Sequence, residues 1–363
     1  MSVALGLARR SLGATWPNPA VGCVLVAGTA DGPAIVGRGW TARGGRPHAE
    51  TEALKRAGAR ARGSTAYVTL EPCSHHGRTP PCAEALIEAG IARAVVAVED
   101  PDPRVSGGGI EALEAAGVAV SRGILAEEAA ALNAGFLTRI ALRRPMVTLK
   151  LATTLDGRIA TATGDSQWIT GARARAVAHG LRARHDAIAV GIGTVLADDP
   201  SLTCRLPGMA DLSPARVVFD STLRLPLDCK LVEQAAEGRR IVLTTDKADA
   251  GRRSRLEKKH VEVIEVAAGM DARVDIAAAL EALADLGVTR LICEGGGGLA
   301  AAFLRADLVD RLAWFRAPSL IGGDGMPALA AFGVDLLQDA PHFVRTAVSR
   351  AGEDTLETYR RPA

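Results

Sequence analysis

The chain has few aromatic side chains and lacks the segments that mark membrane and secreted proteins. Only 3% of its 363 residues are Phe, Trp or Tyr, so its cores must be built from Ala, Val, Leu and Ile. No stretch approaches the ~18 charge-poor apolar residues of a membrane span. In the first residues, MSVALGLARRSLG, the apolar stretch is too short for a signal peptide, and charged residues follow it too soon. The sequence therefore predicts a soluble protein without a membrane partner.

Cysteine and net charge are scarce as well. Six cysteines without a dense spacing pattern favour a reduced, cytoplasmic protein over a disulfide framework. The formal net charge is only +2, and the Arg and Lys residues are scattered. These features argue against nucleic acid as the main partner, although a few local arginines can still bind a small anionic substrate.

Apolar runs alternate with amphipathic stretches along most of the chain, which predicts layered α/β folds. The length favours two domains, and the basic, proline-ended LRRP places their boundary between 1–144 and 145–363. We expect strands at 20–27, 65–70, 93–100, 146–152, 185–191, 215–220, 239–245, 260–266 and 290–296. We expect helices at 3–12, 48–58, 82–89, 110–116, 172–184 and 274–286. The last 30 or so residues carry no distinct motif.

Two segments in the first half hold side chains that suit a zinc site. PHAETEALKRAG begins at residue 47 and contains His48 and Glu50, whereas LEPCSHHGRTPPC contains Cys73 and Cys82. A catalytic zinc takes three protein ligands and keeps one position for water. We therefore predict one zinc ion per chain on the histidine and the two cysteines. Glu50 would move a proton from the water to a leaving group.

The spacing of these residues is close to a known pattern. Zinc deaminases carry H-x-E…P-C-x-x-C, with the glutamate as acid and base and not as a ligand. Here the second cysteine follows the first by nine positions instead of three. Each residue alone would more often be structural, but the set in this order rarely occurs by chance. His75 and His76 are alternative ligands, and we favour a loop role for both.

Residues 15–109 resemble the deaminase half of the bifunctional riboflavin-biosynthesis deaminase/reductase family, the RibD/RibG type. TWPNPAVGCVLV, PHAETEAL and LEPCSHHGRTPPCAEALIEAGIARAVVAVEDPDPRVSGGGI carry the resemblance, and the long gap between the cysteines is typical of that family. It implies that Asn18 contacts the pyrimidine and that Arg78 is a cation for the substrate phosphate or its loop. The chain departs from the family pattern at three positions. Thr41 occupies a position where the family often has His, Asp102 one where it has Asn, and Gly108 one where it has a basic residue.

A second group of motifs lies in the other half. RLICEGGGGLAAAFLRAD predicts a strand, a glycine turn and a helix, an arrangement that lets backbone N–H groups approach a phosphate. GIGTVLADDPSLTCR places Thr194, Asp198, Asp199 and Arg205 after a buried strand, at the sheet edge where ligands of α/β proteins gather. A tight turn and a pre-proline turn would explain the two motifs without any ligand.

LKLATTLDGRIATATGDSQWITG, HDAIAVGIGTVLADDPSLTCR, VVFDS, CEGGGGLAAAFL and SLIGGDG are similar to the reductase half of the same family. The resemblance implies a fold like dihydrofolate reductase and NADPH as cofactor. It assigns the substrate phosphate to Ser166, Arg182, Leu202, Arg205 and Glu294. It assigns NADPH to Ala152, Trp168, Thr194, Asp198, Ser221 and the turn of Gly296, Gly297 and Gly298. Lys150 on the first strand and Asp198 are the expected catalytic side chains.

Together these features predict a cytidine-deaminase-like three-layer domain followed by a dihydrofolate-reductase-like α/β domain. The first would replace the C2 amine of a diaminopyrimidinone ribose phosphate with oxygen. The second would reduce its ribosyl group to ribityl. A homo-oligomer is the expected assembly. The alternatives are a structural zinc module fused to a nucleotide-binding regulator, and a nucleobase deaminase. Structural zinc usually takes four ligands, and a basic patch for nucleic acid is missing.

Overall fold

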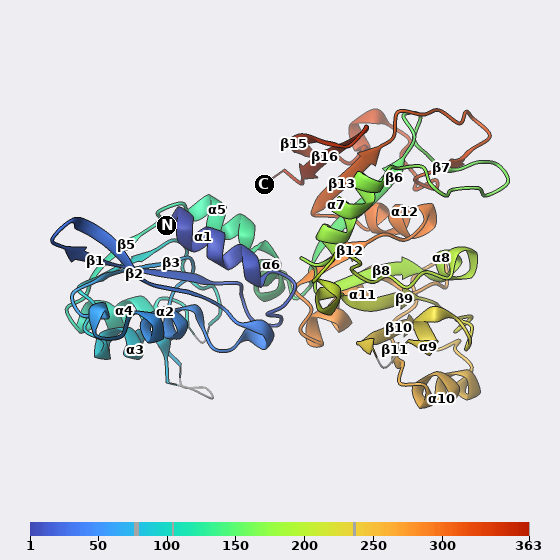
Figure 1. Ribbon diagram of the computed structural model, residues 1–363. Helices are drawn as coiled ribbons and strands as arrows, with labels where there is room; N and C mark the ends of the chain where they lie inside the picture. The colour runs from blue at the N-terminus through green and yellow to red at the C-terminus, as the bar shows by residue number, and fades with distance from the viewer. Residues whose placement is uncertain (76–79, 104, 235–236, 363) are drawn as a thin grey trace. The chain divides into compact units, whose positions relative to one another are not determined.

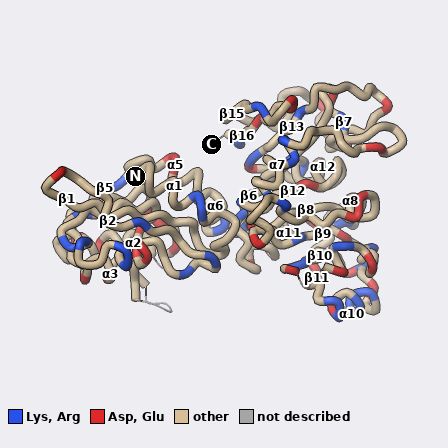
Figure 2. Tube along the Cα trace, in the orientation of Figure 1, with Lys and Arg blue, Asp and Glu red and all other residues tan. Residues whose placement is uncertain are grey.

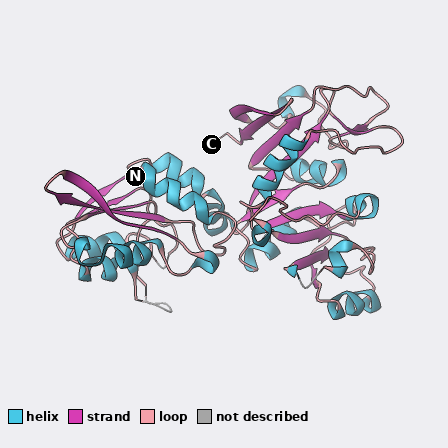
Figure 3. Ribbon diagram, in the orientation of Figure 1, coloured by secondary structure: helices cyan, strands magenta, loops and turns pink. Residues whose placement is uncertain are grey.

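A computed structural model describes residues 1–75, 80–103, 105–234 and 237–362 (Figure 1). The chain divides into two compact units, Met1–Arg143 and Arg144–Ala363. Each unit is built from a mixed β-sheet and the helices that cover it (Figure 3). The predicted fold class, two successive α/β domains, is confirmed.

The first unit is a three-layer fold around a five-stranded sheet of order β2-β1-β3-β4-β5. Its strands are β1 (Gly22–Thr29), β2 (Gly32–Trp40), β3 (Thr65–Val68), β4 (Arg93–Val96) and β5 (Ala119–Arg122). One face carries α1 (Ser2–Ala8) and α5 (Ala126–Leu132), and the other carries α2 (Ala49–Ala57), α3 (Cys82–Glu88) and α4 (Gly108–Ala115) (Figure 1). Helix α6 (Ala134–Leu142) follows α5 and packs against the core on the side of α2. β1 is antiparallel to both its neighbours, whereas β3, β4 and β5 are parallel.

Small and branched aliphatic side chains fill the core of this unit, as the scarcity of aromatic residues predicts. Leu25, Leu86 and Leu113 are fully buried between the sheet and α2, α3 and α4. Phe136 of α6 is the aromatic member of the same cluster. Burial of these apolar side chains supplies the main stabilisation of the unit, at roughly 25 cal/mol per Å².

The second unit contains a nine-stranded sheet of order β11-β10-β9-β8-β12-β6-β13-β16-β15. Its strands are β6 (Met146–Thr153), β8 (Ala187–Gly191), β9 (Ala215–Phe219), β10 (Arg240–Thr244), β11 (Glu262–Glu265), β12 (Arg290–Cys293), β13 (Arg311–Arg316), β15 (Val344–Ala351) and β16 (Asp354–Arg360). β7 (Arg158–Ala160) and β14 (Met326–Pro327) pair separately. The helices are α7 (Ala172–Arg182), α8 (Ile192–Asp198), α9 (Lys230–Glu233), α10 (Ala250–Lys258), α11 (Ile276–Asp285) and α12 (Gly297–Arg305).

Seven neighbouring strands of this sheet, from β11 to β13, are parallel, and β16 and β15 continue it as an antiparallel hairpin. In the central strands β8 and β12 nearly every residue is buried, which explains their continuous apolar sequence. The carboxyl ends of the parallel strands meet at one edge of the sheet. The loops that follow β8 and β12 are therefore brought together there.

Every predicted strand and helix is present, with bounds that shift by a few residues. The elements β2, β5, β7, β13, β14, β15, β16, α5, α6, α8, α9 and α10 were not predicted. β2 contains Gly32, Pro33, Gly37 and Gly39, and such residues weaken the sequence signal of a strand. β15 is exposed along almost its whole length, so it lacks the alternation of apolar and polar residues that reveals a half-buried strand.

Acidic and basic side chains are interspersed along both units (Figure 2). The densest basic stretch that the figure shows lies on α10, an exposed helix at the edge of the second sheet. Among the helices that the structure describes, none is long and apolar enough to cross a membrane.

Candidate active sites

The first candidate site is held at the start of α2 by an unusually close contact between a helix and a strand. His48 is the N-cap of α2, and Glu50 lies in its first turn. A Cβ atom at Gly39 of β2 would lie 1.9 Å from the carbonyl oxygen of Ala49, and one at Gly37 would lie 2.3 Å from that of Ala53. The two glycines therefore let the helix rest directly on the strand, and this contact sets where the histidine and the glutamate lie.

Three side chains with metal-ligating atoms converge at this helix end. The ligand atoms of His48, Cys73 and Cys82 all lie within 4.8 Å of one another. Nδ1 of the histidine is 3.2 Å from Sγ of Cys82 and 3.6 Å from Sγ of Cys73. One imidazole nitrogen and two sulfurs form a donor set that suits zinc and leaves the fourth tetrahedral position open. The residues thus fit a three-ligand catalytic zinc site.

The surroundings of Cys73 favour its thiolate. Its pKa is lowered to about 4 because its sulfur accepts a hydrogen bond from the Cys82 thiol, with a further contribution from His48. The backbone N–H of Cys82, at the start of α3, also donates to this sulfur over 3.3 Å. The same shared hydrogen bond raises the pKa of the Cys82 thiol. Within the pair, Cys73 is therefore the sulfur that ionises first.

Glu50 is almost fully buried, with 3% of its surface exposed. Burial raises the pKa of its carboxyl to about 7, and the neighbouring His48 acts in the opposite direction. A carboxyl group with a pKa near neutrality can both accept and donate a proton at physiological pH. The position of Glu50 is thus chemically suited to the proton transfers that the sequence assigned to it.

A cavity of about 330 Å³ opens onto these residues. This volume lies at the lower end of the range for small-molecule sites. Asn18, the predicted pyrimidine contact, lines its wall beside the metal-ligating cluster. His75 also lines it, and the Nδ1 atom of that ring is buried without a hydrogen-bond partner among the described residues. The predicted phosphate contact Arg78 and the alternative ligand His76 lie outside the described residues.

The three residues that depart from the family pattern, Thr41, Asp102 and Gly108, lie at different places in the first unit. Thr41 lines the cavity, but its hydroxyl accepts the backbone N–H of Val21 over 2.9 Å and is therefore used in holding β1. Asp102 is buried in the cavity wall. Gly108 begins α4, where a Cβ atom would lie 2.9 Å from Oγ of Ser74.

Sequence reasoning missed Glu71, which holds the wall of this cavity in place. Its buried carboxylate accepts backbone N–H groups of Asp100 and Gly107 over 3.1 Å each, of Gly109 over 2.9 Å and of Ile110 over 3.2 Å. These bonds fix the loop between β4 and α4. The glutamate precedes the Pro-Cys pair of the zinc motif, but its partners lie 29 to 39 residues further along the chain. No local pattern reveals them.

Two arginines in the cavity wall were also missed. Arg46 lies just before the first zinc motif, and Arg139 comes from α6. Both bring a positive charge to the space that Asn18 and Glu50 border. A basic residue in a helix is an ordinary surface feature by sequence, so only the fold shows that Arg139 reaches this cavity.

In the second unit, Lys150, Arg182 and Glu294 form a charged cluster at the carboxyl edge of the sheet. Arg182, the last residue of α7, binds the carboxylate of Glu294 through two bonds, Nε to Oε1 over 2.8 Å and Nη2 to Oε2 over 3.0 Å. Nζ of Lys150 on β6 lies 3.4 Å from Oε2. Burial alone would raise the pKa of Glu294, but the two cations hold it well below its usual range. The glutamate is therefore ionised and fixed.

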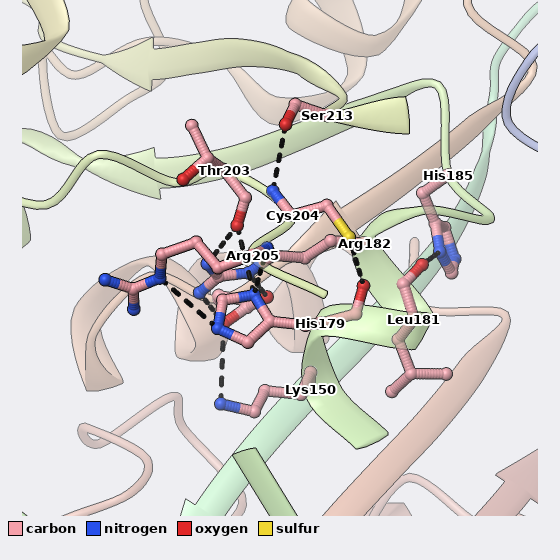
Figure 4. Close-up of polar contacts among 10 residues, drawn as sticks. Lys150, His179, Leu181, Arg182, His185, Thr203, Cys204, Arg205 and Ser213 are labelled. Atoms are coloured by element: carbon pink, nitrogen blue, oxygen red, sulfur yellow. Dashed lines mark hydrogen bonds and ion pairs between the residues drawn. The ribbon is translucent and has the colours of Figure 1, made fainter. Parts of the chain in front are cut away.

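The loop after α8 brings further predicted residues to this cluster (Figure 4). The carbonyl oxygen of Thr203 accepts a bond from Nη1 of Arg182 over 3.0 Å. Leu202 beside it is buried, and Arg205 is exposed. His179, one turn before Arg182 on α7, touches the same loop and was not singled out from the sequence. Ser166 lies partly exposed in the segment before α7.

The predicted cofactor residues are only partly connected with one another. Oγ1 of Thr194 on α8 accepts the N–H of Gly296 over 3.0 Å, and α12 starts at Gly297, so two of the motifs meet. Asp198 is exposed at the end of α8 and makes no bond to Lys150 among the described residues. The other assigned residues are Ala152 on β6, Trp168 with 64% exposure, Gly298 on α12, and Ser221, whose hydroxyl accepts the N–H of Val274 over 3.0 Å.

A histidine–cysteine–cysteine cluster with a buried glutamate on a mixed three-layer fold defines a zinc-dependent deaminase, and here it is followed by a second α/β domain. Residues 1–98 match the family model of the cytidine and deoxycytidylate deaminase zinc-binding region. Residues 145–355, more than half of the chain, match the model of the RibD C-terminal domain. The chain belongs to the RibD family of bifunctional riboflavin biosynthesis enzymes.

Similar proteins cover the chain almost end to end. It is 42% identical to riboflavin biosynthesis protein RibD of Bacillus amyloliquefaciens over 98% of this chain and 93% of that protein. The structure of RibD from Acinetobacter baumannii, form 1, matches with a TM-score of 0.88 and 37% identity over 100% of this chain and 98% of that one. A diaminohydroxyphosphoribosylaminopyrimidine deaminase/5-amino-6-(5-phosphoribosylamino)uracil reductase from Thermotoga maritima matches with a TM-score of 0.87 and 34% identity, over 100% and 97%.

Proposed function

We propose that this enzyme catalyses two successive steps of riboflavin biosynthesis. The first is the hydrolytic deamination of 2,5-diamino-6-ribosylamino-4(3H)-pyrimidinone 5′-phosphate. The second is the NADPH-dependent reduction of the ribosyl group of 5-amino-6-ribosylaminouracil 5′-phosphate to ribityl. The observation that carries the proposal is the metal-ligating cluster of His48, Cys73 and Cys82 at a cavity that His48, Cys73 and the buried Glu50 line. The near full-length similarity to RibD proteins supports the same assignment.

In the first reaction, water and the C2 amine are converted into a C2 carbonyl and ammonia. A zinc ion on the three ligands would act as a Lewis acid that lowers the pKa of water. Glu50 takes a proton from the attacking water and passes it to the ring nitrogen that is double-bonded to C2, and it then carries the second water proton to the departing amine, so that the carbonyl forms and ammonia leaves as a neutral molecule. Asn18 orients the ring. Arg46 and Arg139 give the cavity positive charge for the phosphorylated end of the substrate.

In the second reaction, bound NADPH would supply a hydride to C1′ of the ribose in its ring-opened imine form, in which the C1′–O4′ bond is already broken, and a proton would go to the imine nitrogen. A proton must accompany the hydride, and Lys150 is the group of the charged cluster that can carry it. Glu294 and Arg182 hold each other in a fixed orientation, which gives the sugar phosphate a preorganised surface. Thr194 and the turn from Gly296 to Gly298 would hold the cofactor, because α12 presents its N-terminal N–H groups there.

The test offers the two substrates separately. With the diamino compound and NADPH, one ammonia should be released for each NADPH oxidised. With the deaminated compound, NADPH should be oxidised without ammonia. Absence of NADPH oxidation on the deaminated compound would refute the reductase assignment. Ammonia release that survives removal of zinc by a chelator would refute the metal-dependent mechanism.

We further propose that the enzyme works as a homo-oligomer in the cytoplasm. The outer strand β15 exposes residues 344–350 and its unpaired backbone edge, and such an edge is suited to pairing with a second copy. The two cysteine ligands must be reduced to bind metal, which suits the cytoplasm. Light scattering of wild-type protein and of a Val348→Lys variant on β15 tests the first point. A monomeric wild type would refute it.

A further inference from the structure

The two arginines assigned to the substrate phosphate differ in how many of their N–H groups remain available. Arg182 binds Glu294 through two atoms and the Thr203 carbonyl through a third. Among the described residues, Arg205 makes its hydrogen bonds to His179, one through its backbone N and one through Nε. In the part of the chain that the structure describes, its two Nη groups make no bond to protein. Arg205 is thus the cation with a free planar fork for a phosphate.

His179 contacts Arg205 and, like Arg182, the carbonyl oxygen of Thr203 (Figure 4). It shares one face of α7 with Arg182, because the two are three residues apart in a helix. Its Nδ1 atom is 3.1 Å from the carbonyl oxygen of Thr203 and 3.3 Å from the backbone N of Arg205. Its Nε2 atom is 3.4 Å from Nε of Arg205. Each ring nitrogen therefore faces the loop that carries Arg205.

The partners of the ring determine which nitrogen carries the proton. The carbonyl of Thr203 can only accept, and Nε of Arg205 can only donate. A proton on Nδ1 satisfies both of these contacts, since Nδ1–H then donates to Thr203 and Nε2 accepts from Nε of Arg205, and it gives up only the approach of the Arg205 backbone N–H to Nδ1 at 3.3 Å. A proton on Nε2 would set two donors against each other and leave the shorter contact unsatisfied. The neutral ring with the proton on Nδ1 is therefore the favoured form.

We propose that His179 is a positioning residue of the reductase, which accepts the Nε–H of Arg205 and thereby aims both Nη groups of that arginine at the substrate phosphate. This inference rests on the proposed reductase function and adds a residue to its site. An exposed arginine without this contact would sample several rotamers, and binding the phosphate would then cost more side-chain entropy. His179 thus acts on substrate affinity through Arg205 and has no part in the hydride transfer itself.

The charges around the ring favour the accepting form. Burial and the positive charges of Arg182 and Arg205 lower the pKa of His179, while the Thr203 carbonyl and Glu294 oppose them. Lys150, from β6, adds a cation beyond Glu294. The ring is therefore neutral near pH 7. When the pH falls through this lowered pKa, Nε2 becomes a donor and its contact with Arg205 is lost.

A simpler role must be separated from this one, because His179 could merely pin the loop through Thr203. Two conservative variants divide the contacts of the ring. In H179N the side-chain amide nitrogen replaces Nδ1 and can keep the bond to Thr203, whereas in H179Q the side-chain oxygen replaces Nε2 and can accept from Arg205. The positioning role predicts rescue by Gln, and the pinning role predicts rescue by Asn.

The experiment measures kcat and KM for NADPH-dependent reduction of the deaminated substrate by wild type, H179A, H179N and H179Q. H179A and H179N should raise KM about tenfold with kcat within about twofold, since bonds to charged groups commonly contribute tenfold or more in affinity. H179Q should stay within about threefold of wild type and lose the acid-side rise of KM. In an R205A background, H179A should have no further effect.

Rescue by Asn instead of Gln would overturn the proposal, and so would a loss confined to kcat. A substrate analogue without the phosphate provides a further check, because H179A should not weaken its binding. Ammonia release from the diamino substrate in the same preparations shows whether the first unit is intact. If wild type itself fails to reduce the deaminated substrate, the proposed function fails. If wild type is active and the variants do not separate as stated, only the role of His179 fails.

Discussion

Gly39 and Ala49 touch so closely that a single methyl group could not be added between them, because a Cβ atom on the glycine would lie 1.9 Å from the alanine carbonyl oxygen. This contact presses the first turn of α2 onto β2. It therefore couples the packing of the first unit to the positions of His48 and Glu50, which belong to that turn.

Gly39→Ala should consequently damage both stability and metal binding. Relief of the clash requires backbone movement, and overpacking of this kind costs about 1–3 kcal/mol of unfolding free energy. We expect a lower midpoint in urea and reduced zinc content, measured by metal analysis. Gly28→Ala on β1 is the matched control, because an added Cβ there meets nothing within 4 Å. Equal behaviour of the two variants would show that the contact does not position the site.

Cys82→Ser should lose zinc while the fold is kept. A serine hydroxyl does not ionise at neutral pH, and zinc sites weaken by about 10–100-fold when only a supporting residue is changed. We expect a larger loss for this ligand, read as zinc per chain after dialysis. Cys229→Ser, in the second unit, should retain the metal. Full zinc occupancy in the Cys82 variant would transfer the ligand role to another residue such as His75.

Glu50→Gln should abolish ammonia release without loss of zinc. Glutamine keeps the size and the hydrogen-bonding atoms but cannot carry the proton. General acid–base residues contribute about 10²–10⁴-fold in rate, and Glu50 serves more than one transfer, so the loss should lie near the upper end. The NADPH oxidation of the same preparation with the deaminated substrate should remain close to wild type. A decrease in ammonia release of less than tenfold would remove Glu50 from the mechanism.

Each of the two reactions should proceed without the other, because the chain divides between Arg143 and Arg144 into two compact units. Lys150→Met removes a charge beside Glu294 and should stop NADPH oxidation while ammonia release continues. Asp198→Asn tests the other predicted catalytic residue in the same assay. Mixing the Lys150 variant with Glu50→Gln should restore the overall conversion, because the deaminated intermediate can diffuse between chains. Loss of both activities in either single variant, without recovery on mixing, would indicate that the two sites depend on each other.

The stability of the second unit should fall as the pH drops below 6.5, in part because of His185. This ring is fully buried, Nδ1 bonds the Leu181 carbonyl over 2.7 Å, and Nε2 contacts the Thr148 hydroxyl over 2.9 Å. Burial and Arg290 lower its pKa to about 3. The folded state therefore binds fewer protons than the unfolded state, and the stabilisation present above pH 6.5 is lost as the pH falls toward 3.

Between pH 7.5 and pH 5 this single group should remove about 2 kcal/mol of unfolding free energy, since pH 5 lies about 1.5 units below the unfolded pKa. His185→Gln retains polar atoms but does not titrate. Urea unfolding at the two pH values should show a smaller pH effect in that variant. Other titrating groups act equally on both proteins and cancel in the comparison. An identical pH dependence would mean that His185 is not held neutral by the fold.

Much of this enzyme is determined by its sequence alone. The alternation of apolar runs with amphipathic stretches predicted both α/β units, because burial on two faces of a sheet imposes that pattern wherever it occurs. The zinc motifs predicted a cluster on His48, Cys73 and Cys82. The ability to bind a metal depends on the residue type, and the characteristic order of these residues lies within two short segments of the sequence. Strands such as β2 and β15 escaped, since glycine in one and exposure in the other remove the apolar signal.

The tertiary structure decided which side chains support these sites. Glu71 bonds backbone groups up to 39 residues away, and Arg182 meets Glu294 across 112 residues. His179 and Arg205 come together only because the loop after α8 folds back onto α7. A contact of this kind depends on the path of the whole chain, and the residues that make it have no fixed spacing. The sequence therefore determined the chemistry that the enzyme carries, and the fold determined how the reacting groups are held in position.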